Sequence, residues 1–445
     1  MRVREALDAI RHSLWFVPAL CTVTAAIAAL VLIWIGAETD LDAGELPLVF
    51  GAGADGARAM LQAIAGSIIT VAGVVFSVTI IALQQTSTQF SPRVLRNFMS
   101  DRGNQLVLGV FVATFTYTLL VLRSIKAEDG ADDFVPAIAV SGALLLTLVA
   151  VGMLIYFIHH ISQRIQVTTI LASVAEETLA AHEGQRDWWS SDEDRGWRPA
   201  RPGAPVAVPP SGAIPATTVA DDELLLDAGA SGYLQLIDID ALVDAARDAD
   251  GRLRLLIAPG SWAQRDAPLA AYRGGDLTGE NRDELTRRLG RGITLAHERS
   301  LQQDVAFGIQ QLADVATKAL SPSTNDPTTA INAIDRMVEV LMALGLADDP
   351  PRAFEEGDGT IRLEVPYPTF DELVGLAFDP IRRYGADTPA VVIHVARALS
   401  ILRSLPPARH APLTWQARML ADAAAVIEPK GDHARAVEAL RPLID

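Results

Sequence analysis

A stripe of small polar side chains runs along one long, uncharged apolar segment in the N-terminal part of the chain, residues 59–89. At 100° per residue, the polar positions fall within an arc of roughly 100° on a helix. They are Ser67, Thr70, Ser77, Gln84 and Thr88. Because hydrocarbon offers hydroxyls and amides no hydrogen-bond partner, we expect this stripe to face another helix or water.

Two roles fit such a stripe. In the first, stripes from several protomers line a path across the membrane, and Val74 and Ile81 on the same arc form apolar constrictions. In the second, the hydroxyls bond across a helix interface, while Gly66 and Gly73, one heptad apart beside the stripe, allow close approach. The lack of charge in the segment argues against a proton relay or a strongly ion-coupled transporter. The sequence leaves both roles open.

A second group of polar side chains lies in a predicted turn at residues 321–329. Hydroxyl, amide and carboxylate groups gather there at the start of a helix, where backbone N–H groups can hold an anion. The candidate residues are Ser321, Asn325, Asp326, Thr328 and Thr329. The alternative is a loop in which Asp326 serves only as the helix cap.

The remaining polar residues form no recognisable catalytic, metal or cofactor site. Asp304, with Gln303 and Gln311, is expected on a solvated or interhelical polar face, the alternative being a ligand site. One cysteine, Cys21, excludes a disulfide or a cysteine-based metal site within the chain. No G-x-S-x-G elbow occurs, and the histidines show no diagnostic spacing. We therefore expect a protein that is not an enzyme and that binds no metal or cofactor.

Four apolar segments are long enough to cross a bilayer as helices. They are residues 14–35, 59–83, 106–122 and 135–158. The first has no small-residue cleavage site ahead of a soluble region, so we expect a retained span and not a signal peptide. Half of the 445 residues are hydrophobic, which is typical of a chain with a membrane part.

Basic residues indicate the orientation of these spans. Arginines precede the first span and lie between the second and third, whereas acidic residues crowd the other two loops. The positive-inside rule therefore places the basic loops and both termini in the cytoplasm. Arg123 and Lys126 lie on the opposite side of this assignment.

The rest of the chain is acidic and is predicted to be a cytoplasmic domain. Residues 1–165 hold 10 basic and 12 acidic residues, and residues 166–445 hold 27 and 42, so the tail carries most of the net charge of −17. An acidic surface argues against nucleic acid as a partner. The pattern predicts a helical stalk at 166–183, a flexible linker at 184–218, a small β-α-β region at 219–280 and a helical region at 281–445.

Local signals define several elements in this domain. Helices are expected to begin at Pro327 behind Asp326, at residue 370 behind a capping box of Thr369 and Glu372, and at Pro389. The strand candidates are residues 232–237, 252–257 and 268–272, with a short helix at 239–246. The expected fold is a multi-pass α-helical membrane protein with four spans and a C-terminal cytoplasmic α+β, mainly helical, domain.

Three stretches resemble a bacterial family of predicted membrane proteins, domain of unknown function 2254. They are residues 83–98, 109–111 and 319–330, and the resemblance covers nearly the whole chain in order. It implies an inner-membrane protein with four spans and a cytoplasmic tail, and it brings no assigned reaction. Where this chain has Ser323 and Thr324, the family more often has Gly-Ile, which argues against a strict active site at this turn.

Two functions from different classes follow. The first is a homo-oligomeric, channel-like protein in which the second spans surround a path and the acidic domains assemble below it. The alternative is a membrane-anchored sensor or scaffold, without transport, whose tail binds a partner or ligand. Both require the lipid bilayer as a partner, and neither involves nucleic acid.

Overall fold

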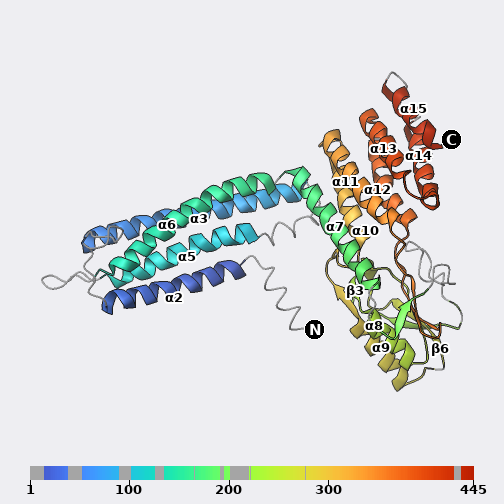
Figure 1. Ribbon diagram of the computed structural model, residues 1–445, viewed down its shortest axis with the longest axis horizontal. Coiled ribbons are helices and arrows are strands. Elements are labelled where there is room, and N and C mark those ends of the chain that lie inside the picture. The colour runs from blue at the N-terminus through green and yellow to red at the C-terminus, as the bar shows by residue number, and fades with distance from the viewer. Residues whose placement is uncertain are drawn as a thin grey trace. The chain divides into compact units, whose positions relative to one another are not determined.

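The computed structural model describes residues 15–38, 53–89, 102–125, 135–164, 166–190, 195–200, 220, 222–275, 277–424 and 432–444. The chain forms two compact units, Met1–Ile170 and Leu171–Asp445. The first consists of long helices, and the second combines helices with β-sheet (Figure 1). The expected combination of an apolar helical region and a mixed helix and sheet domain is therefore confirmed.

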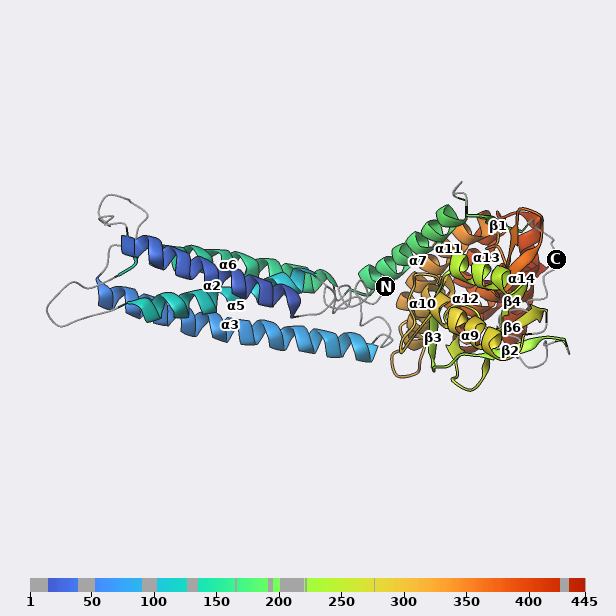
Figure 2. The same cartoon turned by 90° about the horizontal axis from the view of Figure 1, so that it is seen from below.

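In the described part of the first unit, four helices are long and apolar enough to cross a membrane. They run side by side in both views (Figures 1 and 2). They are α2 (Phe16–Glu38), α3 (Ala54–Gln89), α5 (Arg102–Ser124) and α6 (Ala137–Arg164). The predicted number of long apolar helices is confirmed, and each helix extends beyond its predicted C-terminal bound. Residue 135, at the start of the fourth predicted span, is not part of α6, and residue 14, at the start of the first, lies outside the described residues.

Helix α5 is the centre of this bundle. Each of α2, α3 and α6 makes its most extensive contacts with α5. Half of the most apolar stretch of α5 is buried within the protein, whereas 28% or less of the corresponding stretch is buried in each of the other three helices. Close packing depends on small residues: a Cβ on Gly142 of α6 would lie 2.4 Å from the Tyr117 hydroxyl oxygen of α5. That hydroxyl donates a hydrogen bond to the Ala139 carbonyl oxygen at 2.9 Å.

The second unit begins within α7 (Val167–Ser190) and contains two sheets. Among the described residues, the larger sheet has the order β1 (Trp197–Pro199), β8 (Ala353–Glu356), β9 (Ile361–Glu364), β4 (Gly251–Leu255), β6 (Pro268–Gly274), β2 (Leu224–Asp227). Its pairs are antiparallel except β4 with β9. The smaller sheet has the order β5 (Trp262–Ala263), β3 (Gly232–Ile237), β7 (Ile293–Ala296). Helices α8 (Ile239–Asp248) and α9 (Glu280–Gly292) complete this part.

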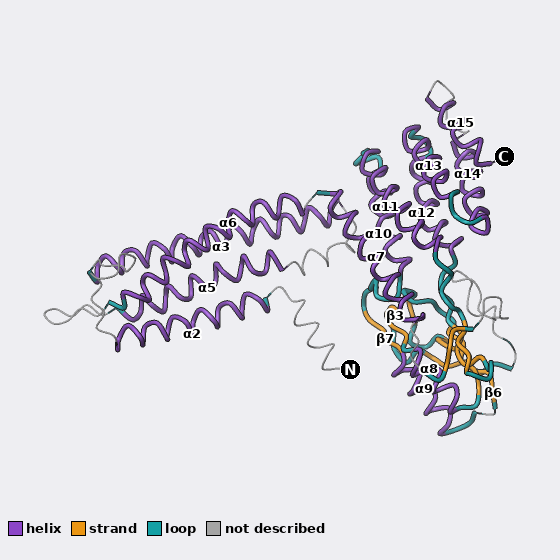
Figure 3. Tube along the Cα trace, viewed as in Figure 1, coloured by secondary structure: helices purple, strands orange, loops and turns teal. Residues whose placement is uncertain are grey.

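The remaining helices form a layered group apart from the strands (Figure 3). They are α10 (Val305–Ala319), α11 (Pro327–Leu346), α12 (Phe370–Gly385), α13 (Pro389–Leu402), the 3-10 turn η3 (Pro407–Arg409), α14 (His410–Ala424) and α15 (Asp432–Ile444). The predicted starts are confirmed: Asp326 caps α11, and Thr369 with Glu372 forms a capping box on α12.

The predicted flexible linker at 184–218 is wrong at its start. Helix α7 continues to Ser190, and β1 pairs with β8. Two tryptophan rings pack this segment against the rest of the unit. The Trp189 ring meets the Tyr367 ring edge-on with centroids 5.5 Å apart, and the centroids of the Trp197 and Phe354 rings are 5.3 Å apart. Burial of large aromatic rings stabilises a segment that lacks periodicity of its own. Residues 201–218 of the predicted linker lie outside the described residues.

The region at 281–445, predicted to be mainly helical, also includes short strands. It contains β7, β8 and β9, each four residues long. Such short strands show too little alternation to be recognised in the sequence. Their pairing partners are distant, because β9 lies parallel to β4 from more than a hundred residues earlier.

Gly260 lies in close contact with both the smaller sheet and Asp304 at the start of α10. Gly260 has a φ of +83°, and its N–H donates to the Leu234 carbonyl oxygen at 2.7 Å. A Cβ at this position would lie 1.9 Å from the Asp304 Oδ2 atom. Gly359, in the turn between β8 and β9, has a similar φ of +87° but nothing within 4 Å of a Cβ.

We expect Gly260→Ala to lower the free energy of unfolding more than Gly359→Ala. Both substitutions add left-handed strain of about 1 kcal/mol, and only Gly260→Ala adds a clash of about 1–3 kcal/mol. Thermal unfolding of the solubilised full-length protein measures both. Equal losses for the two variants would contradict the close approach of Gly260 and Asp304.

Candidate functional site

The polar stripe of α3 lies on the outside of the first unit. All of its residues with described side chains are exposed: Ser67, Thr70, Val74, Ser77, Ile81 and Gln84. The opposite face of α3, with Ile68 and Val75, packs into the bundle. A path lined by these side chains therefore cannot run through a single protomer. The side chain of Thr88 lies outside the described residues.

The hydroxyls of the stripe donate to the backbone of their own helix. Thr70 donates to the Gly66 carbonyl oxygen and Ser77 to that of Gly73, both at 2.8 Å, and Ser67 donates to that of Ile64 at 3.0 Å. Such bonds satisfy the hydroxyl donors without a second helix. The hydroxyl donors therefore do not require a neighbouring helix. A second helix against this face can be favoured only by the shape of the face.

The shape of this face is set by small residues. A Cβ on Gly66 or Gly73 would meet nothing within 4 Å, unlike Gly142, which is needed within the bundle. Among the residues that the structure describes, these glycines therefore have no packing role inside the protomer. They belong to a wider set of small residues at alternating spacings of four and three: Ala59, Ala63, Gly66, Thr70, Gly73 and Ser77. This heptad spacing is typical of helices that pack closely in a left-handed pair.

The polar turn at residues 321–329 connects α10 to α11. Asn325 adopts a φ of +47°, and its N–H donates to the Ser321 carbonyl oxygen at 2.9 Å. Asp326 accepts from the Thr329 N–H at 3.1 Å and from the Thr329 hydroxyl at 2.6 Å. These bonds, with one from the Thr328 N–H, lower the pKa of Asp326. The carboxylate of Asp326 thus occupies the position where a bound anion would sit, and Thr328 remains exposed.

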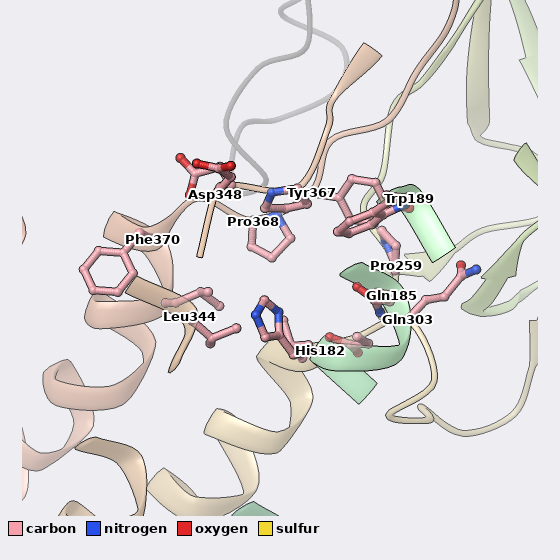
Figure 4. A pocket seen from close by; sticks show the side chains of 15 residues that line it. His182, Gln185, Trp189, Pro259, Gln303, Leu344, Asp348, Tyr367, Pro368 and Phe370 are labelled. Atoms are coloured by element: carbon pink, nitrogen blue, oxygen red, sulfur yellow. The ribbon is translucent and has the colours of Figure 1, made fainter. Parts of the chain in front are cut away.

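A pocket lies among the helices and loops of the second unit (Figure 4). Empty space of about 530 Å³ lies within and in front of it, and this volume includes open solvent. Its walls come from α7, the turn after β4, the start of α10, the end of α11 and the segment before α12. The residues with apolar surface are Trp189, Pro259, Val305, Leu344, Pro350, Tyr367, Pro368, Phe370 and Leu373. Sequence reasoning missed this site, although the tryptophans after residue 184 were a visible signal.

The polar side chains of this pocket differ in their hydrogen-bond partners. Gln303 receives the Ile237 N–H on its Oε1 atom and donates from Nε2 to the Ile237 carbonyl oxygen. Asp304 caps α10 through the Phe307 N–H at 3.0 Å and pairs with Arg299 at 2.8 Å. Burial raises the pKa of Asp304 to about 6, against the opposing effect of Arg299. Gln303 and Asp304 thus have structural contacts, with the end of β3 and with the start of α10 and not on the expected solvated or interhelical polar face.

His182 is different, because its Nε2 atom is buried and has no hydrogen-bond partner in the part of the chain that the structure describes. Figure 4 shows its ring pointing from α7 toward Pro368. Burial lowers the pKa of His182, and the nearby Arg186 adds to this effect more than Glu183 opposes it. The ring is therefore neutral at pH 7. Within the part of the chain that the structure describes, no group of three or more His, Cys, Asp or Glu residues could hold a metal ion.

Comparison with known proteins gives consistent matches along the chain. The family model "Predicted membrane protein (DUF2254)" matches residues 11–400. The uncharacterized proteins Rv1290c of Mycobacterium tuberculosis and Mb1321c of Mycobacterium bovis are each 32% identical over 431 residues, covering 95% of this chain and 78% of theirs. No solved structure matches the chain.

We expect Asp326→Ala to destabilise the first turn of α11 by about 1 kcal/mol, and Asp326→Asn to retain part of the cap. Because the folded pKa of Asp326 is lowered, its contribution is present above its unfolded pKa, about 3.9, and is lost as pH falls through the folded value. Hydrogen exchange of peptides covering 326–334 at pH 7 measures the loss. Unchanged exchange in Asp326→Ala would show that the turn does not depend on this cap.

Proposed function

This chain belongs to the DUF2254 family of predicted membrane proteins, and we propose that it self-associates through α3 into a channel-like homo-oligomer of the bacterial inner membrane. The observation that carries the proposal is the exposed face of α3. It combines polar side chains with two glycines that no contact within the protomer requires. A second copy of α3 is an occupant with matching heptad spacing.

The composition of α3 defines what such an assembly conducts. Hydroxyls at Thr70 and Ser77 retain acceptor lone pairs, and Gln84 adds an amide. Val74 and Ile81, which are 56% and 63% exposed, place apolar side chains on the same face and narrow the path there. No charge lies along residues 59–89, so dipoles and not titrating groups guide the permeating species. Water and small polar solutes fit this lining best.

We propose that both termini and the second unit lie in the cytoplasm. Arg102 begins α5 and Arg164 ends α6, so the two helices place basic residues at the ends that the orientation assigns to the cytoplasm. Arg123, in the last turn of α5, is the opposing residue. The strongly acidic second unit is consistent with a soluble location.

We expect Ser77→Leu and Gln84→Leu to reduce flux through the reconstituted protein by about tenfold or more, because each replaces a polar group of the lining with a branched apolar one. Flux into liposomes is measured under a pH gradient, voltage and membrane tension. Thr24→Leu is the matched control, since Thr24 is an exposed hydroxyl on α2 that also donates to its own helix, to the Leu20 carbonyl oxygen. Equal flux in all variants, or no flux in the wild type, would overturn the channel-like function.

The pocket of the second unit favours a second candidate function. In this alternative the protein is a membrane-anchored sensor or scaffold whose C-terminal unit binds a ligand without transport. Ligand binding in the absence of flux would select this candidate. Its ligand can be inferred from the pocket itself.

A further inference from the structure

We propose that the pocket of the second unit binds a small organic amine in its ammonium form, with an apolar and preferably aromatic body. The inference does not depend on assembly through α3. It rests on the charges, the walls and one unpaired atom of the pocket, all of which belong to the second unit.

The charged residues of the lining favour a cation. All of them are acidic: Asp304, Asp348 and Asp349. Arg299 neutralises Asp304, and Arg409 pairs with Asp349 at 2.7 Å. Asp348 is exposed and forms no ion pair with the described residues. An anion at this opening would be repelled by Asp348, whereas a cation gains a counter-charge there.

The walls favour an apolar body beside that cation. Trp189 and Tyr367 form an aromatic corner, and Tyr367 is 4% exposed. The guanidinium of Arg409 already lies over the Phe370 ring, 5.0 Å from its centroid. The aromatic ring that leaves surface for a ligand is therefore that of the half-buried Trp189, and aromatic rings attract cations by about 0.5–2 kcal/mol. Prolines and Leu344 complete a lining of the kind that holds small organic ligands.

His182 distinguishes an amine from other cations. Its buried Nε2 atom has no partner, and a buried polar atom left unpaired costs about 1–3 kcal/mol. With its proton on Nδ1, a neutral imidazole accepts one hydrogen bond at Nε2, which the N–H of a primary or secondary ammonium group can donate. A quaternary ammonium has no N–H and leaves this atom unpaired. The pocket thus supplies an acceptor, a counter-charge and an aromatic wall for one ligand group.

The test uses 2-phenylethylammonium as the probe and the full-length protein in lipid nanodiscs, with empty nanodiscs subtracted for partitioning into lipid. Isothermal titration calorimetry compares it with neutral 2-phenylethanol, anionic phenylacetate and the trimethylammonium analogue. We expect saturable binding of the primary amine. We expect each of the other three to bind about tenfold more weakly or not at all, because each lacks one partner of a charge-assisted hydrogen bond.

Substitutions locate this binding in the pocket. His182→Leu and Asp348→Asn are each expected to weaken amine binding by about tenfold, and Asp348→Asn also guards against misfolding because Asp348 is exposed. Asp266→Asn, at an exposed aspartate outside the pocket on the same unit, is the control and should bind as the wild type does. Equal binding of amine and alcohol, unchanged binding in Asp348→Asn, or no binding above empty nanodiscs would overturn the proposal.

Discussion

The absence of hydrogen-bond partners in hydrocarbon is the constraint on which the first unit depends. Every polar group at membrane depth must be paired within the protein. The Tyr117 hydroxyl meets this condition through the Ala139 carbonyl oxygen, and Thr70 and Ser77 meet it through their own helix. Because the stripe is satisfied in this way, it can lie on the outer surface of the bundle. We propose, from the exposed glycines, that a second copy of α3 lies against this face.

In the second unit the corresponding constraint is the pairing of buried charges. Asp304 is 3% exposed, yet it caps α10, pairs with Arg299 and lies against Gly260. These contacts join the smaller sheet to the first of the layered helices. The pocket lies at this junction, so its shape follows from the same contacts. His182 lines this pocket, and its buried Nε2 atom has no partner among the described residues, which is why we assign it to a ligand.

The features that the sequence predicted are those that depend on neighbouring residues. Apolar length is such a property, and so four spans were predicted correctly. Helix caps are another, since Asp326 and the pair Thr369 and Glu372 act within one turn. The strand at residues 232–237 was predicted with its observed bounds.

Features that depend on distant contacts were not predictable. The parallel pairing of β9 with β4 leaves no local pattern, and neither does the packing of Trp189 on Tyr367. For this reason the start of the linker was wrong, the short strands within the mainly helical region 281–445 were not predicted, and the pocket was missed. The polar arc of α3 was visible in the sequence, but its position outside the bundle required the neighbouring helices. The anion site considered at residues 321–329 gave way to a cap because the carboxylate and the N–H groups are paired with each other.

Cysteine cross-linking in native membranes tests the contact between two copies of α3 most directly. In a Cys21→Ala background, which removes the only native thiol, Ser77→Cys and Thr70→Cys lie on the proposed contact face. Phe76→Cys is the adjacent control, because Phe76 is 54% exposed but points about 100° away on the helix. Gly152→Cys gives a second control on an exposed glycine of α6. The account predicts disulfide-linked dimers at residues 70 and 77 and none at 76 or 152. Equal cross-linking at residues 76 and 77, or none at 70 and 77, would contradict it.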